Sequence, residues 1–93
     1  MTGETAGLTR KLEDLFRDTK EAHLEAFRHT GGGDPDWPAW YAAYLQAPMA
    51  ALLGVEISAE QLARLLVEVE ARRNAESPGA DWVPYYARFF MAR

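Results

Sequence analysis

The sequence contains no cysteine and no apolar run near the roughly 18 residues that a membrane span needs. Without cysteine there is neither a disulfide framework nor a thiolate metal site, which fits a reducing compartment. The polar, acid-bearing start Met1-Thr2-Gly3-Glu4 is unlike a signal peptide. We therefore expect a cytoplasmic protein with no membrane contact.

Basic residues are too few for a nucleic-acid surface. Ten Lys and Arg stand against fourteen Asp and Glu, for a formal net charge of −4, whereas phosphate neutralisation needs clustered bases. Chains normally divide into domains only beyond roughly 250 residues. The 93 residues are therefore predicted to form one domain, residues 1–93, that does not bind nucleic acid.

Helical periodicity dominates the first half of the chain. Apolar and weakly polar residues recur at steps of three and four from Leu8 to His29, which predicts a long amphipathic helix ended by the glycines at 31–33. Asp36 is placed to cap a second helix over about 37–47. Proline cannot donate a helical hydrogen bond, so Pro48 either kinks this helix or opens a short new helix over 48–53; we favour the break.

Capping signals define the second half. Ser58 and Gln61 have the spacing of a capping box, so a third helix is predicted from there to about Asn74. Asp81 is the expected cap of a fourth helix over about 82–92. We find no strand-like alternation. The predicted fold is all-α, with two αα-hairpin repeats, about 5–54 and 55–93, packed as a compact four-helix domain.

The aromatic residues reveal the repeat. Nine of the eleven lie in segments 36–47 and 81–92, which share the pattern D-W-x-x-[WY]-Y-A-x-[YF]-[LF]-x-A. Each segment follows a longer charged helix and a loop with glycine or proline. Two repeats are fewer than a solenoid needs, so we expect the hairpins to pack on each other with approximate twofold symmetry.

Part of the first repeat also carries a family resemblance. Ala22-His23 and the run from Thr30 to Leu45, with its core Gly31-Gly32-Gly33-Asp34-Pro35-Asp36-Trp37-Pro38, resemble a pattern in small bacterial all-helical proteins of unassigned function. The resemblance covers at most the first half of the chain and implies no activity.

His23 is the sharpest candidate for chemistry, because it lies in the apolar stripe of the first helix. It can serve as a general base, or as a polar contact in a ligand pocket. The pocket residues predicted beside His23 are Trp37, Trp40, Tyr41 and Tyr44. The alternative is a structural histidine that is neutral and bonded to a tyrosine hydroxyl or to Asp34.

Other site chemistry has little support. No Asp, Glu or His stands three or four residues from His23, so no metal site and no cofactor are expected. There is no cysteine nucleophile, and both serines have structural roles in a cap and a turn. No catalytic residue is assigned, and an enzyme is the less favoured reading.

The second and fourth helices are apolar over more than one face. We expect the inner face to hold Trp37, Tyr41, Tyr44, Trp82, Tyr86 and Phe89. Residues beside it are also large, and Trp, Tyr, Phe, Met and Arg are the types enriched at interfaces. The residues predicted at the interface are Trp40, Trp82, Tyr85, Tyr86, Phe89 and Phe90.

The leading hypothesis is a small interaction protein that forms a homodimer or binds another protein. The alternative is a small-molecule binding domain or minor enzyme with the His23 pocket.

Overall fold

The computed structural model describes residues 2–92, with side chains from residue 6 onward. The described chain forms four α-helices and one short 3-10 helix, without strands, so the predicted all-α four-helix class is confirmed. The helices are α1 (Thr2–Ala26), α2 (Trp37–Leu53), α3 (Ala59–Glu76) and α4 (Trp82–Met91), and the 3-10 helix is Arg28–Thr30.

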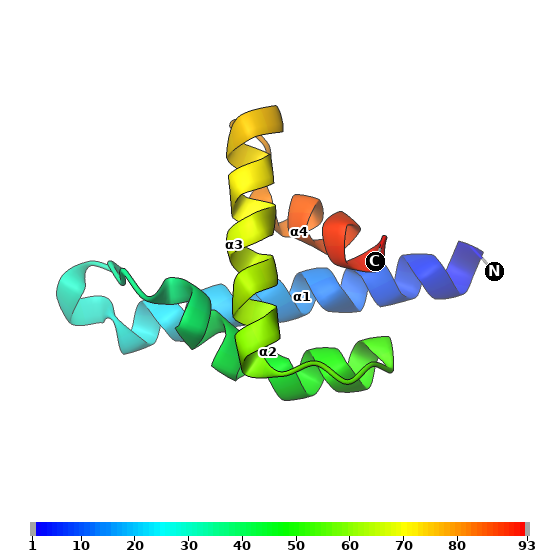
Figure 1. Cartoon of the computed structure of the whole chain (residues 1–93), viewed down its shortest axis with the longest axis horizontal. Coiled ribbons are helices and arrows are strands. Elements are labelled where there is room, and N and C mark those ends of the chain that lie inside the picture. Colours follow the sequence, from blue (N-terminus) through cyan, green and yellow to red (C-terminus); the bar gives the residue numbers. More distant parts are fainter. Residues whose placement is uncertain (1, 93) are drawn as a thin grey trace.

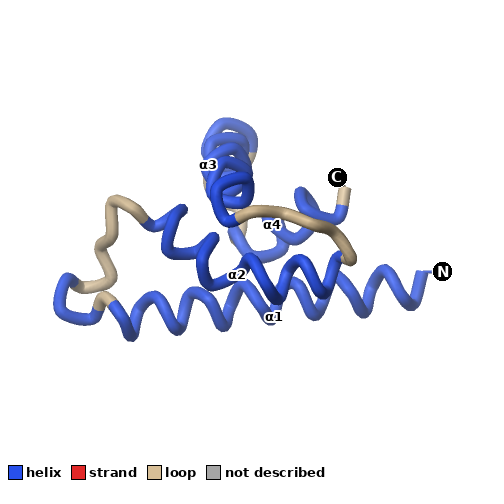
Figure 2. The backbone as a smooth tube through the Cα atoms, turned by 60° about the horizontal axis from the view of Figure 1, so that its bottom comes forward, coloured by secondary structure: helices blue, strands red, loops and turns tan. Residues whose placement is uncertain are grey.

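The two aromatic helices lie between the two long charged ones. Figure 1 shows α2 running back along α1 in the opposite direction, with α3 crossing both steeply. In the turned view of Figure 2, α1 lies below and α3 above, with α2 and α4 between them. Both α2 and α4 pack against α1 and against α3. This arrangement brings the starts of the two aromatic helices, Trp37 and Trp82, to the same region of the molecule.

Phe16 of α1 lies at the centre of the core. It is fully buried, and its ring centroid lies 6.1 Å from that of Trp82, 5.9 Å from that of Tyr86 and 6.0 Å from that of Phe90. Ring pairs at such separations add to the free energy gained by burying their apolar area. The other buried apolar residues are Leu12, Ala42, Leu45, Met49, Leu62, Leu66, Val69, Val83 and Ala87.

The capping predictions for α3 and α4 are confirmed. The Ser58 hydroxyl accepts from the Gln61 amide at 3.0 Å, while the Gln61 side chain accepts from the Ser58 amide at 3.0 Å. The Asp81 carboxylate accepts from the Val83 amide at 3.1 Å. These motifs depend on residues two or three apart, which is why the sequence alone reveals them.

The first helix differs from its predicted bounds. It begins at Thr2 rather than near Leu8, and it ends at Ala26 rather than His29. The chain then tightens into the 3-10 turn, which Gly31 closes in the left-handed conformation at φ 69°. Gly32 is also left-handed at φ 90°, and its amide donates to the Phe27 carbonyl. Glycine suits these two positions because it lacks a Cβ atom.

The predicted break at Pro48 is wrong, because α2 continues through it to Leu53. Proline removes one backbone donor, which leaves the Tyr44 carbonyl without its helical partner. Tyr44 and Pro48 both lie on the exposed side of the helix, where water can satisfy that carbonyl. Leu45 and Met49 are buried on the opposite side and hold the segments before and after Pro48 against one core.

Two further details of the aromatic helices need correction. The Asp36 side chain does not cap α2, since its backbone at φ −100° and ψ 29° lies outside the extended region typical of a cap. Tyr44 was expected inside but is 41% exposed. In α4 the buried residue is Phe90, whereas Phe89 is half-buried, because the helix turns Val83, Tyr86 and Phe90 toward Phe16.

Candidate functional site: an aromatic cleft

A cleft opens where the end of α1 and the following loop meet the starts of α2 and α4. It has a volume of about 280 Å³ and contains three of the predicted pocket residues, His23, Trp37 and Tyr41. Its full lining is Lys20, His23, Leu24, Gly32, Asp34, Trp37, Tyr41 and Trp82. Below, this site is called the aromatic cleft.

The other two predicted pocket residues lie outside the lining. The Trp40 ring meets the His23 ring edge-on at 5.0 Å but does not line the cavity. Tyr44 stacks on Trp40 at 5.6 Å and an angle of 12°, on the exposed side of α2. The structure therefore joins Trp37 and Tyr41 to His23 in the cleft and leaves Tyr44 on the surface.

His23 and Asp34 form a buried pair at the base of the cleft. The His23 Nε2 and Asp34 Oδ2 atoms are 3.1 Å apart, and the two side chains are 7% and 8% exposed. The other Asp34 oxygen accepts from the Asp36 amide at 3.0 Å. The glycine turn at 31–33 brings the loop back over α1, so Asp34 reaches a histidine eleven residues earlier. Of the two structural partners that the sequence offers His23, a tyrosine hydroxyl or Asp34, the contact with Asp34 is present.

Aromatic rings hold the His23 imidazole on its other sides. Phe27 stacks on it at 4.7 Å with an interplanar angle of 27°, and Tyr41 packs at 5.2 Å. When Nε2 carries the proton it donates to Asp34, which leaves Nδ1 as the acceptor. A histidine oriented by a carboxylate in this way can act as a base. The cleft lining contains no serine, threonine or cysteine nucleophile beside it, so the geometry favours binding over nucleophilic catalysis.

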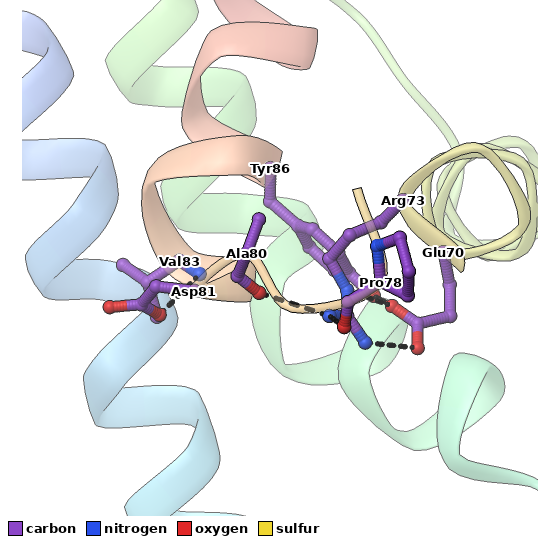
Figure 3. A network of polar contacts seen from close by, with 7 residues as sticks. All are labelled: Glu70, Arg73, Pro78, Ala80, Asp81, Val83 and Tyr86. Carbon is purple, nitrogen blue, oxygen red and sulfur yellow. Dashed lines mark hydrogen bonds and ion pairs between the residues drawn. The ribbon is translucent and has the colours of Figure 1, made fainter. Parts of the chain in front are cut away.

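A second cavity of about 180 Å³ adjoins the cleft and shares Trp37, Tyr41 and Trp82 with it. Its remaining lining residues, Glu70, Arg73 and Tyr86, form a closed polar network. Figure 3 shows the Arg73 and Tyr86 side chains converging on the Glu70 carboxylate. Arg73 donates to its two oxygens at 3.0 and 2.9 Å, and the Tyr86 hydroxyl donates at 2.8 Å.

This network connects α3 to the loop before α4. Arg73 Nη1 also donates to the carbonyl oxygens of Ala80, at 3.0 Å, and Pro78, at 3.4 Å. The guanidinium thus binds a carboxylate on its own helix and two carbonyls beyond it. Because these donors and acceptors satisfy each other, the network's clearest role is to fix the position of α4.

The pKa shifts in this region follow from burial and hydrogen bonding. The Arg73 hydrogen bonds lower the pKa of Glu70 despite its partial burial, and the Tyr86 hydroxyl adds to this effect. Burial, followed by the hydrogen bond to Glu70, raises the pKa of Tyr86 far above its usual range. Burial also raises the pKa of Tyr41. At neutral pH the network therefore holds a charged carboxylate and a protonated tyrosine.

Several residues predicted at the interface have partners within the chain. Tyr86 and Phe90 are 3% and 6% exposed, so they belong to the core and are not available to a partner. Trp82 lines the aromatic cleft. The Tyr85 hydroxyl donates to Glu76 at 2.6 Å.

Two predicted interface residues remain near the surface. The Phe89 ring lies under the Arg72 guanidinium at 5.6 Å. Trp40 is half-buried beside the exposed Tyr44. Of the two aromatic helices, α2 therefore presents the surface without charged cover.

One surface feature escaped the sequence interpretation. It is a groove of about 360 Å³ lined by Leu8, Leu53, Val55, Glu56, Ile57, Leu65, Phe90 and Met91, which only the tertiary fold assembles. The outward face of α2, which the sequence predicts to be apolar, contains no charge, since none of the seventeen residues of the helix is charged.

Within residues 2–92, no three His, Asp or Glu side chains lie close enough to hold a metal ion. No helix in the same part of the chain is both long and apolar enough to cross a membrane. Comparison of the chain with protein-family models, curated proteins and solved structures gave no match in any of the three. The resemblance to small bacterial helical proteins stays a prediction, and functional inference rests on the residues themselves.

Proposed function

We propose that this protein is a small helical interaction domain that self-associates through the outward face of α2. The observation that carries the proposal is the absence of charge along this helix, whose exposed positions are alanine, proline and tyrosine. Helices that are apolar on more than one side usually bury the second side on a partner. A cytoplasmic location, expected from the cysteine-free sequence, belongs to the same proposal.

The outward face has the spacing of a packing seam. Trp40, Tyr44, Ala47 and Ala51 follow one another at steps of four, three and four residues; we call these four residues the α2 seam. This spacing places them along one side of a helix. The buried residues of α2, Ala42, Leu45 and Met49, lie on the other side, against the core. Three of the four seam residues, Tyr44, Ala47 and Ala51, are exposed and so remain available to a partner.

The seam favours a second copy of the chain as its partner. Its large rings lie in the first half and its alanines in the second, so two antiparallel seams set Trp40 against Ala51 and Tyr44 against Ala47 of the other copy. Such an arrangement is self-complementary, as a twofold interface requires. The chain carries a net charge of −4, so two copies repel each other where their charged surfaces face. Contact through α2, which has no charged residue, avoids placing like charges opposite each other.

The size of the seam sets the expected affinity. From Trp40 to Ala51 the helix rises about 16 Å, at about 1.5 Å per residue. One helix face of this length is smaller than the standard interface of about 800 Å² per partner. We therefore expect a reversible dimer of micromolar or weaker affinity rather than an obligate one.

Sedimentation equilibrium over a concentration series from about 10 μM to about 1 mM tests this proposal. The parent chain should shift from monomer to dimer across the series. Ala47→Lys should remain monomeric, because it places a cation opposite an apolar surface. Ala71→Lys, at an exposed alanine of α3, is the matched control and should dimerise normally. A parent chain that stays monomeric throughout, or equal effects of the two lysines, would contradict the proposal.

A further inference from the structure

Beyond self-association, we propose that the aromatic cleft binds a small organic cation of the methylated or quaternary ammonium class. The proposal rests on three observations about the lining: the angles between its rings, the buried Asp34 carboxylate and the pairing of the charges around it. None of them involves the α2 seam.

The rings of the cleft form walls at steep angles rather than a flat slot. Trp37 and Tyr41 lie 5.5 Å apart at 82°, and Tyr41 and Trp82 lie 6.2 Å apart at 63°. The three rings that line the cleft are therefore inclined to one another. A planar ligand needs parallel ring faces, whereas a rounded cation can contact several inclined faces at once. The electron-rich faces of tryptophan and tyrosine attract such a cation.

The carboxylate of Asp34 adds negative charge at the base of the cleft. Its side chain is 8% exposed, and it is held by His23 at 3.1 Å and by the Asp36 amide at 3.0 Å. A carboxylate with so little water around it strengthens the attraction for a cation, because a low local dielectric weakens screening. Neutral ligands gain nothing from this charge, and anions are repelled by it.

Two basic side chains near the rings, Arg73 and Lys20, could oppose the binding of a cation, but they do so to different extents. Arg73 is neutralised by Glu70, which it contacts through two hydrogen bonds at 3.0 and 2.9 Å. Lys20 lies at the rim and is exposed, so its flexible side chain can extend into solvent. Lys20 therefore weakens binding of a cation without blocking the cleft, and its removal should strengthen binding.

The cavity size limits the ligand. A volume of about 280 Å³ is slightly below the range of about 300–1,000 Å³ found for sites of drug-sized ligands. Tetramethylammonium and choline are suitable probes, because each presents a compact methylated cation. The alcohol 3,3-dimethylbutan-1-ol has the shape of choline without its charge, so it separates cation recognition from apolar burial.

The test is a nuclear magnetic resonance titration of the labelled chain with choline chloride, the neutral alcohol and sodium chloride at matched concentrations. It uses the Ala47→Lys background, so that self-association does not enter. Choline should cause saturable shifts at the Trp37 and Trp82 indole N–H signals, and the alcohol should bind about tenfold more weakly. Equal binding of the two, or shifts that sodium chloride reproduces, would overturn the proposal.

Variants identify the groups responsible. Lys20→Gln should bind choline more tightly, and Asp34→Asn more weakly by several-fold. Trp82→Leu should lose most binding, while Tyr85→Leu, at a ring of the same helix outside the lining, is the matched control. If Trp82→Leu does not fold, Lys20→Gln still tests the proposal, because Lys20 is exposed and its replacement should not affect folding. A choline affinity of Lys20→Gln that is equal to or weaker than that of the parent would contradict a cation site. A failed titration leaves the dimer proposal untouched, since that is measured separately.

Discussion

The buried pair of His23 and Asp34 makes a specific prediction about stability. The Asp34 side chain is 8% exposed, and besides His23 its other hydrogen-bond donor is the Asp36 amide. Replacing His23 with leucine should therefore leave a buried carboxylate that has lost one of these two partners. Breaking a buried pair by removing one partner costs about 3 kcal/mol, because the other charge stays buried. In a domain of this size that lowers the Tm by roughly 12–24 °C, at about 4–8 °C per kcal/mol.

The same reasoning predicts a rescue. Asp34→Asn alone should cost only about 1 kcal/mol, since the amide oxygen still accepts from Asp36 and the amide group still meets the imidazole. Added to His23→Leu, it removes the buried charge and should return about 1–2 kcal/mol. Urea unfolding followed by far-ultraviolet circular dichroism gives the four free energies of the cycle. His29→Leu, at an exposed histidine, is the control and should stay within about 0.5 kcal/mol.

A loss of stability in His23→Leu no larger than that in His29→Leu would contradict a stabilising role of the buried pair. A further loss of stability when Asp34→Asn is added to His23→Leu would contradict it as well, because the cost of His23→Leu would then come from lost packing and not from an unpaired charge.

Three further predictions concern the scaffold. Pro48→Ala should raise the Tm, because α2 already continues through this position and alanine restores a backbone donor. Arg73 lowers the pKa of Glu70 in the folded state, so the pair stabilises the fold fully at pH values above the unfolded pKa of about 4.5. This contribution is lost as the pH falls through the lower pKa of the folded state. Glu70→Gln should therefore make the free energy of unfolding less dependent on pH on the acid side. Gly32→Ala should destabilise by about 1–2 kcal/mol in thermal melts, since φ is 90° and a Cβ atom would lie 2.9 Å from a neighbouring side chain, whereas Gly79→Ala faces open space and should be mild.

Local sequence signals predicted the parts of the fold that depend on neighbouring residues. The capping box of Ser58 and Gln61 and the Asp81 cap need only a spacing of two or three residues, and both are present. Pro48 was misjudged because its local penalty is outweighed by the burial of Leu45 and Met49 around it. Propensity is a weak guide where tertiary packing decides.

The candidate site was predicted in part for the same reason. The apolar stripe placed His23 in the interior, and the loop composition named Asp34 as one partner. Which rings would reach His23 depends on how α2 rotates against α1, and this rotation left Tyr44 outside. The contribution of Trp82 comes from α4, at a distance in sequence that no local pattern specifies.

Contacts between two copies of α2 test the central claim most directly. A concentrated mixture of isotope-labelled and unlabelled chains allows nuclear Overhauser effects between copies to be selected from those within one copy. The antiparallel seam predicts such effects from the Tyr44 ring to the Ala47 methyl, and from the Trp40 ring to the Ala51 methyl, of the other copy. Effects between copies that fall on α3 or α4 instead, or their absence at concentrations where the chain sediments as a dimer, would contradict the account.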